Sequence, residues 1–223
     1  MVNKVKTLLK MVNITCSSSY AMQVANEYWQ NTTVTHTSMN EVEFDDYYQK
    51  IFELLNPNKD NTILDYGGGN GEIAFRFQQK GYEVEHCDIS KEMVSNAINQ
   101  YGLKSSICSK LKDDTYNKIL FHNAFFYVHP SLVEALLKNM HSSLLDNGQL
   151  YITDTPDFDK RENLNLNKVH MFFTKLFPVY QVNMSGFYVE HKKLEALAQK
   201  IGFKIEKFDS WCNYRSHWIL TKV

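Results

Sequence analysis

The residues with the clearest chemical potential form one short loop after an apolar run. Asp65 is followed by the glycine-rich segment 67–71, and helical-looking sequence begins at Glu72. Residues 62–64 predict the end of a buried parallel strand. Glycines directly after such a strand let the backbone turn sharply and approach a ligand where a Cβ would clash. The pattern predicts a nucleotide-type cofactor above the N-terminus of the next helix.

The spacing of this loop indicates which cofactor it holds. In a dinucleotide-binding loop, a third glycine stands three residues after the second and packs the helix against the strand. Counted from Gly67 and Gly69, that position is Glu72, whose negative charge would lie beside a pyrophosphate. The series Asp65, Gly67, Gly69, Gly71 instead suits a cationic ligand without phosphates. S-adenosylmethionine is a ligand of that kind.

The segment Asp65-Tyr66-Gly67-Gly68-Gly69-Asn70-Gly71 resembles the first motif of the class I S-adenosylmethionine-dependent methyltransferases, in which an acid precedes glycines at alternate positions. The resemblance implies that the chain transfers a methyl group from S-adenosylmethionine and releases S-adenosylhomocysteine. Asp65, Tyr66 and the backbone of Gly67, Gly68 and Gly69 would then lie beside the cofactor. Tyr66 departs from the pattern, because a small or apolar residue is common at its position.

A second carboxylate follows the next predicted strand. Residues 82–87 predict a strand that ends at Asp88, and a helix is expected over 91–100. A carboxylate at that point can accept hydrogen bonds from both ribose hydroxyls. The resemblance gives Asp88 this role, places Ile89 over the adenine, and puts Ser109 near the adenine, where many relatives carry an acid. In the alternative interpretation, Asp88 is only a helix N-cap and the glycine segment is an ordinary tight turn.

Methyl transfer needs the acceptor atom, the methyl carbon and the sulfur in line, and a hydroxyl acceptor must also lose its proton. Histidine is the commonest general base, and His122, His129 and His170 come near strand ends or the insertion defined below. His122 follows the fourth predicted strand, where a role in bonding to backbone or lining the methionine portion of the cofactor is favoured over base catalysis. His129 could simply precede a helix. Asp154, beyond the fifth predicted strand, could bind a sugar hydroxyl or orient a base, or form a turn with Pro156.

Strands and helices alternate along most of the chain. Strands are expected at 62–64, 82–87, 103–108, 116–121, 149–153, 203–208 and 217–221. Helices are expected at 91–100 and 130–145, and a turn follows at 146–148. A late helix, with Leu194, Leu197 and Ile201 on one face, is expected to end at Gly202. Two terminal strands without a long helix between them predict an antiparallel final hairpin. The chain is therefore predicted to be an α/β protein with a doubly wound, Rossmann-like, mostly parallel seven-stranded sheet, an arrangement typical of the resembled family.

Residues 1–60 lie outside this core. Helices are expected at 20–29 and 41–55, and in the resembled family such N-terminal helices often form a lid over the cofactor. Their aromatic stripe could equally pack on the sheet. Residues 61–223 are predicted to form the cofactor-binding core, with an insertion at about 157–180 over the substrate pocket. A length of 223 residues with 43% hydrophobic content is enough for one substantial core.

Composition narrows the class of acceptor. A net charge of −1 and only three arginines leave no basic stripe for nucleic acid, so a small or saccharide-like acceptor is favoured. The strings 118–127 and 149–157 resemble segments of bacterial methyltransferases of surface-polysaccharide biosynthesis, which would imply O-methylation of a sugar or another metabolite. No metal is expected, because the resembled metal-dependent catechol-type enzymes carry an acid around Phe121 and His122 that is absent here. The four cysteines lack zinc-site spacing and are predicted to be reduced and buried.

Location and competing functions can also be addressed from the sequence. No apolar run approaches transmembrane length and the N-terminus lacks the apolar region of a signal peptide, so a cytoplasmic protein with no membrane partner is expected. Two other functions stay open. A nicotinamide-dependent oxidoreductase is disfavoured by Glu72, and a non-catalytic binding or scaffold protein of the same fold is compatible with the motifs.

Overall fold

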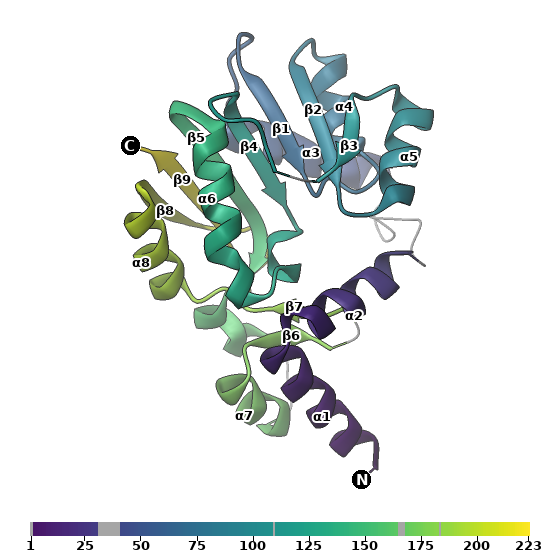
Figure 1. The fold of residues 1–223 in the computed structure, drawn as a ribbon, viewed down its shortest axis with the longest axis vertical. Coiled ribbons are helices and arrows are strands. Elements are labelled where there is room, and N and C mark those ends of the chain that lie inside the picture. Colours follow the sequence, from purple (N-terminus) through teal and green to yellow (C-terminus); the bar gives the residue numbers. More distant parts are fainter. Residues whose placement is uncertain (1, 31–40, 109, 165–167, 183) are drawn as a thin grey trace.

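The centre of the molecule is a seven-stranded sheet. Figure 1 shows its place in the computed structural model, which describes residues 2–30, 41–108, 110–164, 168–182 and 184–223. The strand order is β3-β2-β1-β4-β5-β9-β8. The bounds are β1 Thr62–Tyr66, β2 Glu83–Asp88, β3 Ser105–Ile107, β4 Tyr116–His122, β5 Leu144–Pro156, β8 Phe203–Asp209 and β9 Arg215–Lys222. Strands β1 to β5 are parallel, and β9 runs antiparallel to both β5 and β8. The predicted fold class is confirmed.

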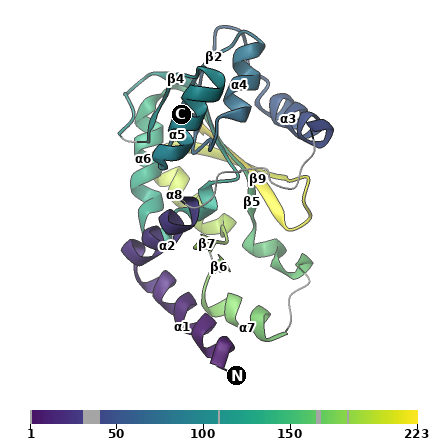
Figure 2. The same cartoon turned by 90° about the vertical axis from the view of Figure 1, so that its right-hand side faces the viewer.

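Helices cover both faces of this sheet because alternate strand residues point to opposite sides. Buried Leu64 and Ile119 face α6 (Val133–Ser143) and α8 (His191–Ile201), whereas Ile63 and Leu120 face the opposite layer. That layer holds α3 (Glu41–Leu55), α4 (Glu72–Gln79) and α5 (Lys91–Tyr101). Figure 2 shows α3 and α6 on opposite sides of the sheet. The strand order reverses at β1, where β2 lies on one side and β4 on the other, and ligands of such sheets bind beyond that point.

A smaller group of elements lies beyond the carboxyl ends of the parallel strands (Figure 1). It consists of α1 (Val2–Cys16), α2 (Ser18–Gln30), α7 (Lys168–Leu176) and the hairpin of β6 (Val179–Gln181) with β7 (Gly186–Phe187). Met11 and Ile14 of α1 share one buried cluster with Val179 and Phe187. The N-terminal segment therefore packs on the predicted insertion, although the two are far apart in sequence. Short turns of 3₁₀-helix complete the fold: η1 (Phe125–Tyr127), η2 (Pro130–Leu132) and η3 (Phe158–Asn163).

One helix lies outside the predicted elements, and two expectations about local structure are wrong. No element is predicted for residues 2–16, because the valines and threonines of α1 give it low helix propensity and burial of Met11 and Ile14 decides its structure. Residues 146–148 are not a turn before the fifth strand. The strand already begins at Leu144, whose side chain is fully buried, and an irregularity around Asn147 (φ 61°) absorbs the extra residues.

The second wrong expectation is that all four cysteines are buried. All four are free thiols, but only Cys87 is buried, whereas Cys16 is exposed and Cys108 and Cys212 are partly exposed.

Over the described ranges, the helices are too short or too polar to cross a bilayer.

Candidate cofactor and acceptor site

The glycine loop between β1 and α4 has the backbone that its sequence predicts. Gly67, Gly69 and Gly71 have φ values of 69°, 60° and 82°, a region that residues with a Cβ rarely adopt. Gly68 is required for a different reason. A Cβ on it would lie 2.4 Å from Oδ2 of Asp65, which is tucked beneath the loop. The loop can therefore lie directly on the carboxylate only because it is made of glycine.

The Asp65 side chain is buried without a cation beside it. It is 2% exposed, and no cationic side chain of the described residues forms an ion pair with it. Burial raises the pKa of Asp65 to about 7, the backbone N–H of Ala74 opposes this effect, and the nearby Asp88 carboxylate adds to it. A buried carboxylate without a cation beside it is costly, and a bound cation would offset that cost. The site therefore fits a positively charged ligand.

Asp88 joins the end of β2 to the glycine loop. Its Oδ2 accepts a hydrogen bond from the Gly69 N–H at 3.0 Å, and its Oδ1 accepts one from Ser90 N–H at 2.8 Å. Burial raises the pKa of this carboxyl as well. The alternative that Asp88 is the N-cap of α5 is wrong, because Ser90 occupies that position and its hydroxyl accepts from the Met93 N–H.

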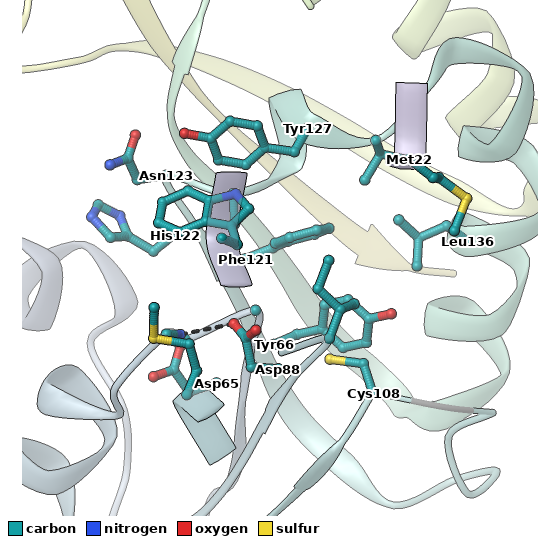
Figure 3. A pocket seen from close by; sticks show the side chains of 18 of the residues that line it. Met22, Asp65, Tyr66, Asp88, Cys108, Phe121, His122, Asn123, Tyr127 and Leu136 are labelled. Carbon is teal, nitrogen blue, oxygen red and sulfur yellow. Dashed lines mark hydrogen bonds between the residues drawn. The ribbon is translucent and has the colours of Figure 1, made fainter. Parts of the chain in front are cut away.

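A cavity of about 300 Å³ opens between the loop and the smaller group of elements (Figure 3). One side is formed by Asp65 to Gly69, Asp88 and the half-exposed Ile89. The other side carries mostly apolar side chains, including Met22 and Trp29 of α2, Tyr127, Leu132 and Leu136. In Figure 3, Asp65, Asp88 and Cys108 lie opposite Tyr127, Met22 and Leu136. Ser109, expected near the adenine, lies outside the described residues.

His122 lines the same cavity and is held from both ring nitrogens. Its Nδ1 lies 2.7 Å from Oγ1 of the buried Thr153, and its Nε2 lies 3.0 Å from the hydroxyl of Tyr47, which α3 supplies. The Tyr47 hydroxyl also donates a hydrogen bond to Oδ2 of Asp154 at 2.7 Å. Burial, followed by the Asp154 carboxylate, raises the pKa of Tyr47, so the phenol keeps its proton. His122 and Asp154 are thus brought together through Tyr47.

Asp154 lies within β5 rather than beyond it, at a break in the register with β9 and with φ 51°. Arg215 of β9 stabilises this conformation. Its Nη1 donates to the Asp154 carbonyl at 2.8 Å and lies 3.1 Å from Oδ2. The same nitrogen lies 2.6 Å from Oδ1 of Asn123, which has φ 49°. Burial alone would raise the pKa of Asp154, but Arg215 and His122 outweigh it and hold that pKa below its usual value.

His129 also lines the cavity, but both of its ring nitrogens are engaged in structural contacts. Nδ1 accepts from the Ser131 N–H at 3.2 Å, and Nε2 lies 3.1 Å from the carbonyl of Thr15 in α1. His129 therefore caps η2 and joins it to the N-terminal helix. The side chain of His170 is outside the described part of the chain. The insertion contributes no residue to the described cavity lining, and it packs on α1 instead.

Sequence reasoning missed Tyr47, Arg215 and Asn123. Tyr47 was expected only as part of an aromatic stripe, and Arg215 fell just before the predicted last strand. Asn123 was adjacent to His122 but carried no motif. Arg215 had one available signal, since it is one of only three arginines and β9 begins with it next to β5.

Comparison with known proteins agrees with this geometry. A sequence model of a methyltransferase-domain family matches residues 39–207. A curated relative, an uncharacterized methyltransferase of Staphylococcus carnosus (strain TM300), is 29% identical over 143 residues, which is 60% of this chain and 67% of the relative.

Solved structures show the same fold at low identity. Magnesium protoporphyrin IX methyltransferase of Synechocystis PCC 6803, with bound S-adenosylhomocysteine, has a TM-score of 0.65 at 15% identity, over 91% of this chain and all of that one. An S-adenosylmethionine-dependent methyltransferase of Methanosarcina mazei has a TM-score of 0.61 at 17% identity, over 77% of this chain and 97% of that one. Since the family model covers most of the chain, this protein belongs to the class I S-adenosylmethionine-dependent methyltransferases.

Proposed function

We propose that this enzyme methylates an oxygen atom of a small acceptor, a hydroxyl of a sugar or of another metabolite. The observation that carries the proposal is the position of His122, which lines the same cavity as the glycine loop and has its Nε2 beside a hydroxyl group, that of Tyr47. An acceptor hydroxyl that replaces Tyr47 would therefore meet a ring nitrogen at hydrogen-bonding distance. A general base must lie within hydrogen-bonding distance of the group whose proton it removes.

The cofactor would lie along the glycine loop and supply an electrophilic methyl group. Asp65 would balance the positive charge of the ammonium group at its amino-acid end, since that carboxylate is buried and no described cation pairs with it. Asp88 would accept hydrogen bonds from the ribose hydroxyls, and Ile89 would cover the adenine. Tyr66 and the backbone of Gly67 to Gly69 would complete this side of the site.

His122 would serve as the base after a change of tautomer. Tyr47 donates its single proton to Asp154, so it accepts a hydrogen bond from His122 Nε2–H. Thr153 then donates to Nδ1. When an acceptor hydroxyl replaces Tyr47, His122 can donate from Nδ1 to Thr153 Oγ1 and present the lone pair of Nε2. Asp154 would orient the acceptor or the imidazole ring of His122. His129 would take no part in proton removal, because both of its ring nitrogens make structural contacts.

The test is a panel of acceptors with the purified chain and S-adenosylmethionine. The panel pairs hydroxylated compounds, including free and nucleotide-linked sugars, with amine analogues of the same size. We expect S-adenosylhomocysteine to accumulate, with a methyl ether detected by mass spectrometry, only with hydroxylated members. Turnover of the amine analogues alone would contradict an oxygen acceptor while leaving the family assignment intact.

A further inference from the structure

Helix α1 has an apolar stripe on the side that faces away from the core. Met11 and Ile14 are buried in the cluster beneath the helix, with exposed fractions of 3% and 0%. Val5 and Leu9, one turn apart, are 53% and 57% exposed. At 100° per residue, Leu9 points about 160° away from Met11. The helix is therefore apolar on two opposite faces, and the described part of the chain covers only one of them.

Helix α7 repeats this pattern. Phe172 and Leu176, also one turn apart, are 60% and 59% exposed, while Thr174 between them is fully buried. The two helices belong to one packed unit, because Phe173 and Phe177 join the cluster that buries Met11. Figures 1 and 2 agree that α1 and α7 together form one end of the molecule, away from α4 and α5.

The two helices carry charges of one sign in their sequences: α1 has lysines at 4, 6 and 10, α7 has lysines at 168 and 175, and neither helix contains an acid. Among the side chains that the structure describes, Lys6 is exposed and Lys10 is partly exposed. The whole chain has a net charge of −1, so this cationic end is a local excess and not a property of the composition. Exposed Lys6 lies three residues before Leu9, about 60° away around the helix, so charge and apolar surface are adjacent.

We propose that the end formed by α1 and α7 docks on the surface of an anionic lipid bilayer. Val5, Leu9, Phe172 and Leu176 insert among the headgroups, and Lys6 and Lys10 contact the lipid phosphates and carboxylates. Cationic helices with exposed large apolar residues bind bilayers in this way, through buried apolar area plus attraction to anionic lipid. Such a helix lies in the interface, so the docking needs no membrane-spanning segment.

The charges and the shape favour a bilayer over other occupants. A symmetric contact with a second copy would set the lysines of one α1 against those of another, which costs free energy. A peptide partner needs a groove, whereas these four side chains are exposed. They belong to two helices that form one end of the molecule (Figure 2). A planar anionic surface meets both the charge and the projecting apolar side chains.

The test is flotation of the full chain with large unilamellar vesicles of phosphatidylcholine, with and without phosphatidylserine, at low and at physiological salt. We expect the chain to float with phosphatidylserine vesicles and to be released partly by salt. The variant Leu9→Ser/Phe172→Ser should lose binding roughly tenfold or more, because the inserted apolar area is lost. The variant Ile98→Ser/Phe208→Ser removes two exposed apolar side chains elsewhere, at 46% and 41% exposure, and should bind as the wild type does.

Correct folding of each variant is checked by titration with S-adenosylmethionine, since none of the four positions lines the cavity. Absence of flotation with phosphatidylserine vesicles would overturn the proposal. Equal loss in the two double variants would also overturn it. A dimer seen by light scattering that Leu9→Ser/Phe172→Ser dissociates, without lipid binding, would assign this end to a second copy instead.

Discussion

Arg215 and Asp154 form an ion pair across the antiparallel strands β5 and β9, with the arginine Nη1 3.1 Å from Oδ2 of the carboxylate. The side chains are only 12% and 11% exposed, so water solvates both charges poorly. The pair holds Asp154 and Asn123 in left-handed backbone conformations beside His122. The polar side of the acceptor site therefore depends on an arginine that lies on the last strand of the chain.

Replacing Arg215 with methionine should lower the free energy of unfolding by about 3–5 kcal/mol, because it leaves the Asp154 carboxylate buried without its cationic partner. The measurement is urea unfolding at neutral pH. Arg215→Met/Asp154→Asn should recover part of the loss. The matched control is Arg76→Met, which breaks a more exposed pair with Asp45 and should cost about 1 kcal/mol or less. Similar losses for the two arginine variants would contradict the importance of the buried pair.

Asp65 predicts a specific pH dependence of stability. Its pKa is 3.8 in the unfolded chain and about 7 in the fold, so between these values the folded protein holds a proton that the unfolded chain has lost. This group therefore lowers stability as pH rises from about 4 to about 7. Asp65→Asn removes the effect, and its stability relative to wild type should rise by about 2 kcal/mol between pH 5 and pH 8.

The comparison with wild type is needed because two histidines act in the opposite sense. Burial lowers the pKa of His86 and of His217 to about 4, so each adds stability as pH rises towards 6.5. Their effect cancels in the difference between Asp65→Asn and wild type. A difference that stays constant from pH 5 to pH 8 would show that Asp65 is ionised throughout.

Asp88 should matter most for cofactor affinity. Asp88→Ala is expected to weaken binding of S-adenosylmethionine by about 1–3 kcal/mol, because charge-assisted contacts to the ribose are lost. Calorimetric titration measures this directly. Asp88→Asn should lose less, since its amide oxygen can still accept from Gly69 N–H or Ser90 N–H. The exposed Asp146→Ala serves as the control, and an unchanged affinity in Asp88→Ala would remove the ribose assignment.

Variants of Tyr47 and His122 should distinguish acceptor binding, seen in KM, from proton removal, seen in kcat. His122→Gln is expected to lower kcat by about 10²–10⁴-fold, the usual contribution of a general base. Tyr47→Phe should lower the acceptor KM by about fivefold. In the wild type the acceptor must displace the hydrogen bond between Tyr47 and His122 Nε2, which costs about 1 kcal/mol, and the variant lacks that bond. Steady-state kinetics with the acceptor identified in the panel tests both. A higher KM with Tyr47→Phe would show that the phenol binds the acceptor rather than giving way to it.

Gly68 should be the least replaceable glycine of the loop. Gly68→Ala places a Cβ 2.4 Å from the buried Asp65 carboxylate, so the loop must shift and cofactor binding should be lost. Gly102→Ala is the matched control. Its φ of +64° costs about 1 kcal/mol of stability, but no heavy atom lies within 4 Å of the added Cβ, and cofactor affinity should stay within twofold. Thermal unfolding and calorimetry distinguish the two effects.

Much of the cofactor side could be predicted because its signals are local. Asp65, the glycines and Asp88 follow directly from strand ends, and the backbone needs of a tight loop restrict those positions to glycine. The acceptor side could not be assembled in the same way. Tyr47, His122, Asp154 and Arg215 come from four separate elements, and their contacts depend on how α3 and β9 pack on the sheet. Strand periodicity also cannot show that Asp154 lies at a break in register with φ 51°.

By itself, the sequence determined the α/β class, the glycine loop and the pair of carboxylates at the ends of β1 and β2, because periodicity, glycine spacing and charge act over a few residues. Only the tertiary structure decided which side chains face the cavity together, that α1 and the insertion form one unit, and that His129 is a cap. Those outcomes depend on burial and on hydrogen bonds between residues far apart in the chain. Those contacts form, and stabilise the protein, only after the sheet has brought the elements together.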